Sequence, residues 1–160
     1  MKKHMTVKQV GMGERDVLLF LHDSRTPHRD EWDQSMADLN EYARTRDLKN
    51  LRCLVITDGG GPDTAMRGEL MEFYKAQHHY LKTAVITNSL VSRGIVAAVS
   101  WFNPYIKAFS PRHFGDALDH LELARSAAPR ILREAQNMER ELSPNVCLAL
   151  ITGLSTSATL

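Results

Sequence analysis

One stretch, residues 51–64 (LRCLVITDGGGPDT), constrains the fold of this chain more than any other. Its first half is a short apolar run rich in β-branched residues, which is typical of a strand covered on both faces. The three consecutive glycines at 59–61 end that strand, because they make both strand and helix costly. Asp63 and Thr64 are then candidates to cap a following helix. A strand, a glycine turn and a helix start together form a common ligand-binding corner of α/β proteins.

Strands and helices alternate on either side of this stretch. Short apolar runs predict strands at residues 6–10, 16–22, 51–57, 82–88 and 105–109. Apolar residues that recur every three or four positions predict helices at residues 30–46, 64–79, 90–102 and 112–121. The short turn between the first two strands predicts an antiparallel hairpin, and the later alternation predicts parallel strands. We therefore expect an α/β fold with a mixed, mostly parallel five-stranded sheet and helices on both faces.

The composition changes after residue 123. A fifth helix is predicted at residues 126–142, where a narrow apolar seam can pack on its own domain or against a second copy. The seam consists of Ile131, Ala135, Met138 and Leu142. Residues 146–152 are predicted to form a strand or an extended segment. We expect one domain in residues 1–123, with the C-terminal helix and tail of residues 124–160 packed on it or on a partner.

Length and charge exclude several classes of protein. A chain of 160 residues can bury a core of its own, and a net charge of +1 gives no basic field for nucleic acid. The N-terminus lacks the apolar core of a signal peptide, and no apolar run is long enough to cross a bilayer. Cys53 and Cys147 do not suggest a disulfide framework. We expect a cytoplasmic protein.

The segment Thr83–Leu123 resembles the closing unit of the SpoIIAA-like fold, the group that includes STAS domains. There, an F-x-P start leads into a final helix with the pattern D-A-L-x-x-L. The residues that match it are Phe109, Pro111, Asp116, Ala117, Leu118 and Leu121. The likeness extends over about residues 6–123 and implies the strand order 1-3-2-4-5.

The resemblance also implies a function class, that of a bacterial regulatory or protein-interaction domain without enzymatic activity. In the anti-sigma-factor antagonists of this fold, a partner kinase phosphorylates a serine that opens the helix after the central strand. Thr64 is the hydroxyl residue at that position. The resemblance therefore implies Thr64 as a phosphoacceptor.

Polar residues follow several of the predicted parallel strands, whose carboxyl ends meet at one edge of a sheet. We predict that this edge binds a ligand or a partner through Ser24, Asp58, Gly59, Gly60, Gly61, Thr64, Ser89 and Arg93. Glycine N–H groups, a helix N-terminus and an arginine could together hold an anion. Alternatively, the polar residues cap helices and the glycines only make the turn. The loop matches neither nucleotide-binding glycine motif, so no nucleotide site is predicted.

No complete catalytic or metal-binding motif is present. His22, Asp23 and Ser24 are adjacent in sequence, so their side chains diverge and cannot form a triad. A hydrolase that pairs His22 with a serine from another strand is an alternative. His78 and His79 are adjacent, so they lack the spacing of a metal site. We expect no catalytic residue, no cofactor and no metal, and a partner that is another protein or a second copy.

Residues 101–105 (WFNPY) form an aromatic corner. Such a corner can pack in the core or form a partly exposed docking patch.

The sequence as a whole leads to three hypotheses of function. In order of preference, they are a protein-interaction domain, a small-anion-binding protein that uses the loop at 59–61, and a hydrolase.

Overall fold

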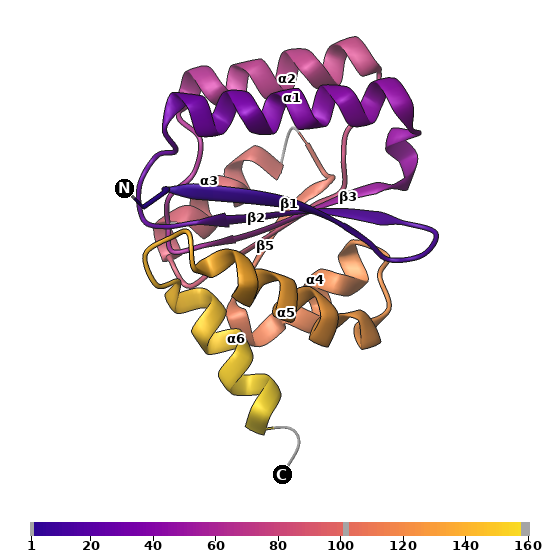
Figure 1. Cartoon of the computed structure of the whole chain (residues 1–160). Coiled ribbons are helices and arrows are strands. Elements are labelled where there is room, and N and C mark those ends of the chain that lie inside the picture. Colours follow the sequence, from indigo (N-terminus) through magenta and orange to yellow (C-terminus); the bar gives the residue numbers. More distant parts are fainter. Residues whose placement is uncertain (1, 101–102, 158–160) are drawn as a thin grey trace.

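The computed structural model describes residues 2–100 and 103–157, and Figure 1 shows a central sheet between two layers of helices. The strands are β1 Met5–Gly11, β2 Asp16–His22, β3 Leu51–Thr57, β4 Thr83–Thr87 and β5 Ile106–Phe109. The α-helices are α1 Arg29–Thr45, α2 Thr64–Gln77, α3 Leu90–Ser100, α4 Phe114–His120, α5 Ala128–Glu139 and α6 Val146–Ser157. Short 3-10 turns are η1 Leu48–Asn50, η2 Pro111–His113 and η3 Arg125–Ala127.

The five strands lie in the order in which they occur in the sequence, β1-β2-β3-β4-β5. The first pair is antiparallel and the other pairs are parallel, as the sequence predicted. The predicted order 1-3-2-4-5 is wrong. The turn at residues 12–15 is too short to carry β1 past a neighbouring strand, and it pairs Gly11 with Asp16 directly.

Helices cover both faces of the sheet. In Figure 1, α1 and α2 lie above it, and α4, α5 and α6 lie below. Side chains of one strand alternate between the two layers: Leu18 of β2 packs with the α1–α2 side, and Leu19 packs with the α4–α6 side. On β3, Leu54 and Ile56 pack on the α4–α6 side, and both are fully buried.

The C-terminal residues add two helices to the α4 side of the sheet. All four residues of the predicted seam are buried, in one cluster with residues of β1, β2 and β3. Three of them lie on α5, and Leu142 follows the end of this helix, which stops at Glu139 and not at residue 142 as predicted. The predicted strand at 146–152 is wrong, because these residues form α6. The side chain of Asn145 accepts a hydrogen bond from Leu148 N (2.8 Å), which caps the start of this helix.

The remaining boundaries follow local signals. Asp63 caps α2 by accepting a hydrogen bond from Met66 N at 2.9 Å. The predicted helix at 112–121 begins as the turn η2, with Pro111 at its start. In the aromatic corner, Trp101 and Phe102 lie outside the described residues. The division of the chain at residue 123 stays a prediction.

Shortening a side chain in a central strand should cost stability. We expect Leu54→Ala and Ile86→Ala each to lower the free energy of unfolding by about 2–5 kcal/mol, because both side chains are fully buried and leave a cavity. Leu90→Ala is the matched control, since Leu90 is exposed. Chemical denaturation measures the change. A loss below about 1 kcal/mol at both core positions would contradict their central role.

Candidate interaction site at the carboxyl edge of the sheet

The glycine loop packs directly on the loop that follows β2. A Cβ atom at Gly60 would lie 2.2 Å from Arg25 O and 2.4 Å from Asp23 O. Only glycine fits at this distance, because the neighbouring atoms are main chain and cannot move aside cheaply. The close approach fixes the ends of β2 and β3 against each other.

The N–H groups of the loop are largely used within the protein. Gly59 N donates to Thr57 Oγ1 (3.0 Å), and Gly60 N donates to Asp23 O (2.9 Å). The Thr57 hydroxyl in turn donates to Gly60 O (2.6 Å). Since Asp63 also caps α2, most of the donors that an anion would need already have partners. The arrangement therefore favours the capping and turn role of these residues over an anion cradle.

Two serines connect the start of α3 to the same loop. Ser89 Oγ accepts a hydrogen bond from Ser92 N (3.1 Å), which caps α3, and Ser92 Oγ donates to Gly59 O (3.1 Å). Sequence reasoning missed Ser92. Arg93 follows in the first turn, and its Nε is buried without a hydrogen-bond partner among the described residues. The ends of β3 and β4 are thus bridged through α3.

The C-terminal segment closes the opposite side of this edge. Asn145 Nδ2 donates to the main-chain oxygen of His22 at 3.0 Å. Cys147 N donates to Asp58 Oδ1 at 3.1 Å. The sequence predicted Asp58 in the site but gave no role to Asn145, although asparagine after Ser143 and Pro144 is a helix-start signal.

The thiol of Cys147 joins two strand ends. Its Sγ donates to Thr57 O (3.0 Å) and accepts a hydrogen bond from Asn88 N (3.1 Å). Burial raises the pKa of this thiol, so it stays protonated and able to donate at neutral pH. These contacts cover part of the edge from the side of α6.

His22 lacks the surroundings of a catalytic base. The residue is 3% exposed. Burial lowers the pKa of its imidazole to about 4, although the negative charge of Asp23 acts in the opposite direction. Among the described residues, its Nδ1 is buried and has no hydrogen-bond partner, so no serine is paired with this nitrogen. The geometry gives no support to the hydrolase alternative.

The outer rim combines polar and apolar groups. Ser24 and Thr64 are exposed, and Thr64 Oγ1 accepts a hydrogen bond from Arg67 Nη2 at 3.1 Å. Next to the loop, Leu90 and Val91 at the start of α3 are 77% and 73% exposed. Over its eleven residues α3 has no buried residue, although it is rich in apolar side chains. The sequence predicted an apolar side for this helix, formed by Ile95, Val96, Val99 and Phe102. Of these, Ile95 is exposed, Val96 and Val99 are partly buried, and Phe102 lies outside the described residues.

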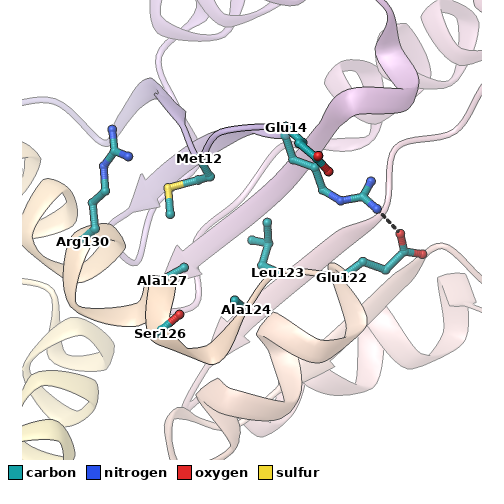
Figure 2. A pocket seen from close by; sticks show the side chains of 9 residues that line it. Met12, Glu14, Glu122, Leu123, Ala124, Ser126, Ala127 and Arg130 are labelled. Atoms are coloured by element: carbon teal, nitrogen blue, oxygen red, sulfur yellow. Dashed lines mark ion pairs between the residues drawn. The ribbon is translucent and has the colours of Figure 1, made fainter.

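A cavity of about 430 Å³ lies at the other edge of the sheet, at the amino ends of the parallel strands. Figure 2 shows Met12 and Leu123 towards its middle, with Arg130 and Glu122 on opposite sides. The residues that line it are Met12, Glu14, Arg15, Glu122, Leu123, Ala124, Ser126, Ala127 and Arg130. None of them was predicted as a site residue, because they come from the first hairpin turn and from the α4–α5 connection with the start of α5, which are far apart in sequence.

Glu122 joins three cations at this edge. Its carboxylate lies 3.0 Å from Arg15 Nη2, 3.0 Å from Arg52 Nη2 and 2.5 Å from Lys82 Nζ. The hydrogen bonds from Lys82 and Arg52 lower the pKa of Glu122 to about 2. The guanidinium of Arg52 is almost fully buried, so Glu122 supplies the charge that it needs. This carboxylate holds together the starts of β2, β3 and β4.

The rest of the described chain offers no metal site and no membrane span. Among residues 2–100 and 103–157, no three His, Cys, Asp or Glu side chains are grouped so that they could hold a metal ion. None of the described helices is both long enough and apolar enough to cross a membrane.

Comparison with known proteins identifies the fold. Neither a protein-family model nor a curated protein matches the sequence. The structure is similar to the crystal structure of an uncharacterised protein of the DUF3478 family, with a SpoIIAA-like fold, from Shewanella loihica PV-4. The identity is 16%, the TM-score is 0.54, and the match covers 74% of this chain and 94% of that one. The chain therefore has a SpoIIAA-like fold, and about a quarter of it has no counterpart in that structure.

Two neighbouring glycines should respond differently to the same change. We expect Gly60→Ala to lower the free energy of unfolding by about 1–3 kcal/mol or more, because the new methyl group meets main-chain oxygens. Gly61→Ala is the matched control, since its added methyl group meets no atom within 4 Å. Urea denaturation of both variants provides the comparison. Equal stabilities would show that the loop does not need the close approach at Gly60.

The ion pairs of Glu122 should make stability depend on pH. Because its pKa falls from 4.5 to about 2 on folding, the stabilisation is fully present above pH 4.5 and is lost as the pH falls towards 2. We expect Glu122→Gln to be less stable than the wild type at pH 7, with the gap closing near pH 2. Glu72→Gln, at an exposed helix pair, is the control. A gap that stays constant over this range would rule out the effect.

Proposed function

We propose that this protein is a non-enzymatic domain that binds another protein through the rim at the carboxyl edge of its sheet. The observation that carries the proposal is the exposure of Leu90 and Val91 beside the glycine loop. Adjacent large apolar side chains that stay in water mark interaction surfaces. Burying one such side chain in a contact stabilises a complex by about 1.5–3 kcal/mol.

The composition of α3 supports a protein partner. Arg93 is its only charged residue, and Ile95 adds a further exposed apolar side chain one turn along the helix. An amphipathic helix would bury its apolar side on its own sheet. In α3, Leu90, Val91 and Ile95 are exposed and available to a partner, whereas Val96 and Val99 are partly buried.

The polar side of the rim would give such a contact its specificity. Ser89 and Arg93 flank the apolar residues in the sequence of α3, and Ser92 joins this helix to the loop at 59–61. Ser24 and Asp58 follow the ends of β2 and β3, and Thr64 begins α2. Thr64 stands at the exposed start of α2, so a kinase could reach its hydroxyl. Phosphorylation there would add charge next to Arg67 and change the surface that the partner meets.

A small-anion site at the glycine loop is the second hypothesis from the sequence. Its support is now limited to Arg93, because Gly59 N and Gly60 N already have partners within the protein. A protein contact needs no free main-chain donors at the loop. We therefore favour a protein partner.

Negative charge introduced on the rim should weaken the binding of the partner protein. We expect Leu90→Asp combined with Val91→Asp, and separately Thr64→Glu, to reduce the partner recovered by affinity capture from the native host, quantified by mass spectrometry. The aspartates place charge in the apolar contact, and the glutamate adds charge and bulk at a helix start where the dipole tolerates it. Circular dichroism checks the fold.

Ala37→Asp is the matched control, because Ala37 is exposed on α1, away from this edge. It adds one negative charge, as Thr64→Glu does, and should leave recovery unchanged. If the rim variants are folded and capture the same proteins in the same amounts as the wild type, the rim is not the contact surface.

A further inference from the structure

The cavity at the amino ends of the parallel strands has the size of a small-molecule site. Its volume of about 430 Å³ lies within the roughly 300–1,000 Å³ that is usual for ligand pockets. Its apolar part comes from Met12, Leu123 and Ala127, which all pack with the hydrophobic core behind it. Charged side chains surround this part, with Arg130 on the side opposite Glu122 (Figure 2). The cavity therefore combines an apolar surface with a charged rim.

Arg130 brings an uncompensated positive charge to the cavity. It is exposed in the first turn of α5, and its side chain has no hydrogen-bond or ion-pair partner among the described residues. Its charge acts on Glu134, but that carboxylate already accepts a hydrogen bond from Lys8. The guanidinium of Arg130 therefore keeps its donors free for a group that enters the cavity.

The carboxylate on the opposite side does not oppose an anion. Glu122 is bound by Arg15, Arg52 and Lys82, so these four residues together carry a net positive charge. Together with Arg130, they place positive charge on both sides of the cavity. The electrostatic field in the cavity therefore favours a negatively charged ligand.

Further carboxylates belong to the elements around the cavity. Asp116 and Asp119 of α4 pair with Arg125, and neither of them lines it. Glu14 does line it, is exposed on the hairpin turn, and has no partner among the described residues. Because water and salt screen an exposed charge, Glu14 weakens the attraction for an anion without cancelling it. Removal of this charge should therefore strengthen the binding of an anion.

The lining favours an aromatic ligand over an aliphatic one. The thioether of Met12 packs well against an aromatic ring, and a guanidinium such as that of Arg15 or Arg130 packs well over the face of one. Leu123 and Ala127 accept either kind of apolar group. None of the described residues that line the cavity is itself aromatic, so the ring would come from the ligand.

We propose that this cavity binds a small aromatic carboxylate, with its carboxylate at Arg130 and its ring over Met12 and Leu123. A guanidinium can donate two parallel hydrogen bonds to a carboxylate, which fixes the direction in which the ligand lies. The proposal does not rest on the proposed function, because the cavity and the rim beside α3 lie at opposite edges of the sheet.

NMR of the full chain with labelled methionine methyl groups measures this binding, with hydrocinnamate as the probe. We expect a saturable shift of the Met12 methyl signal, assigned through Met12→Leu, while the signal of Met71 on α2 stays in place. Phenethylamine has a similar ring with the opposite charge and should not bind. Cyclohexanepropionate has the carboxylate without an aromatic ring and should bind more weakly than hydrocinnamate.

Two variants test the charges at the cavity. Arg130→Ala should weaken the binding of hydrocinnamate about threefold or more, and Glu14→Gln should strengthen it. Arg133→Ala is the matched control, because Arg133 is exposed on the same helix and also acts on Glu134, but does not line the cavity. It should bind hydrocinnamate like the wild type. Circular dichroism checks the fold of each variant.

Three results would overturn the proposal. The first is a Met12 signal that shows no saturable shift with millimolar hydrocinnamate. The second is binding of phenethylamine or cyclohexanepropionate that is as strong as that of hydrocinnamate. The third is an equal affinity of folded Arg130→Ala and Arg133→Ala for the probe.

Discussion

The close approach of Gly60 to the main chain of Asp23 and Arg25 is the constraint on which the carboxyl edge depends. It holds the ends of β2 and β3 so close together that no Cβ atom fits at residue 60. Thr57 and Ser92 then connect the loop to its own strand and to α3 through their hydroxyl groups. The main role of the loop is therefore structural, because it connects β2, β3 and α3. Its internal hydrogen bonds leave few N–H donors for an anion.

The C-terminal segment completes this joint from the other side. Asn145 and Cys147 contact the ends of β2, β3 and β4, although they lie far from these strands in sequence. On the other side of the edge, Leu90 and Val91 of α3 stay exposed.

Helices α3 and α6 begin close together, since Asn88 N donates to Cys147 Sγ. Both helices expose apolar residues. At the start of α3, Arg93 and the hydroxyl groups of Ser89 and Ser92 lie beside the exposed Leu90 and Val91. The start of α6 is capped by Asn145, and its Cys147 N donates to Asp58.

The sequence by itself determined the alternation of elements, because the periodicity of apolar residues, the glycines at 59–61 and the cap at Asp63 act within short segments. The order β1-β2-β3-β4-β5, the burial of His22 and the closure of the edge by Cys147 were decided by the tertiary structure. An uncharged apolar run such as 146–152 suits a strand or a buried helix equally well by itself. It became a helix with one side buried because Asn145 caps it and because the sheet offers an apolar face for Leu148 and Ile151.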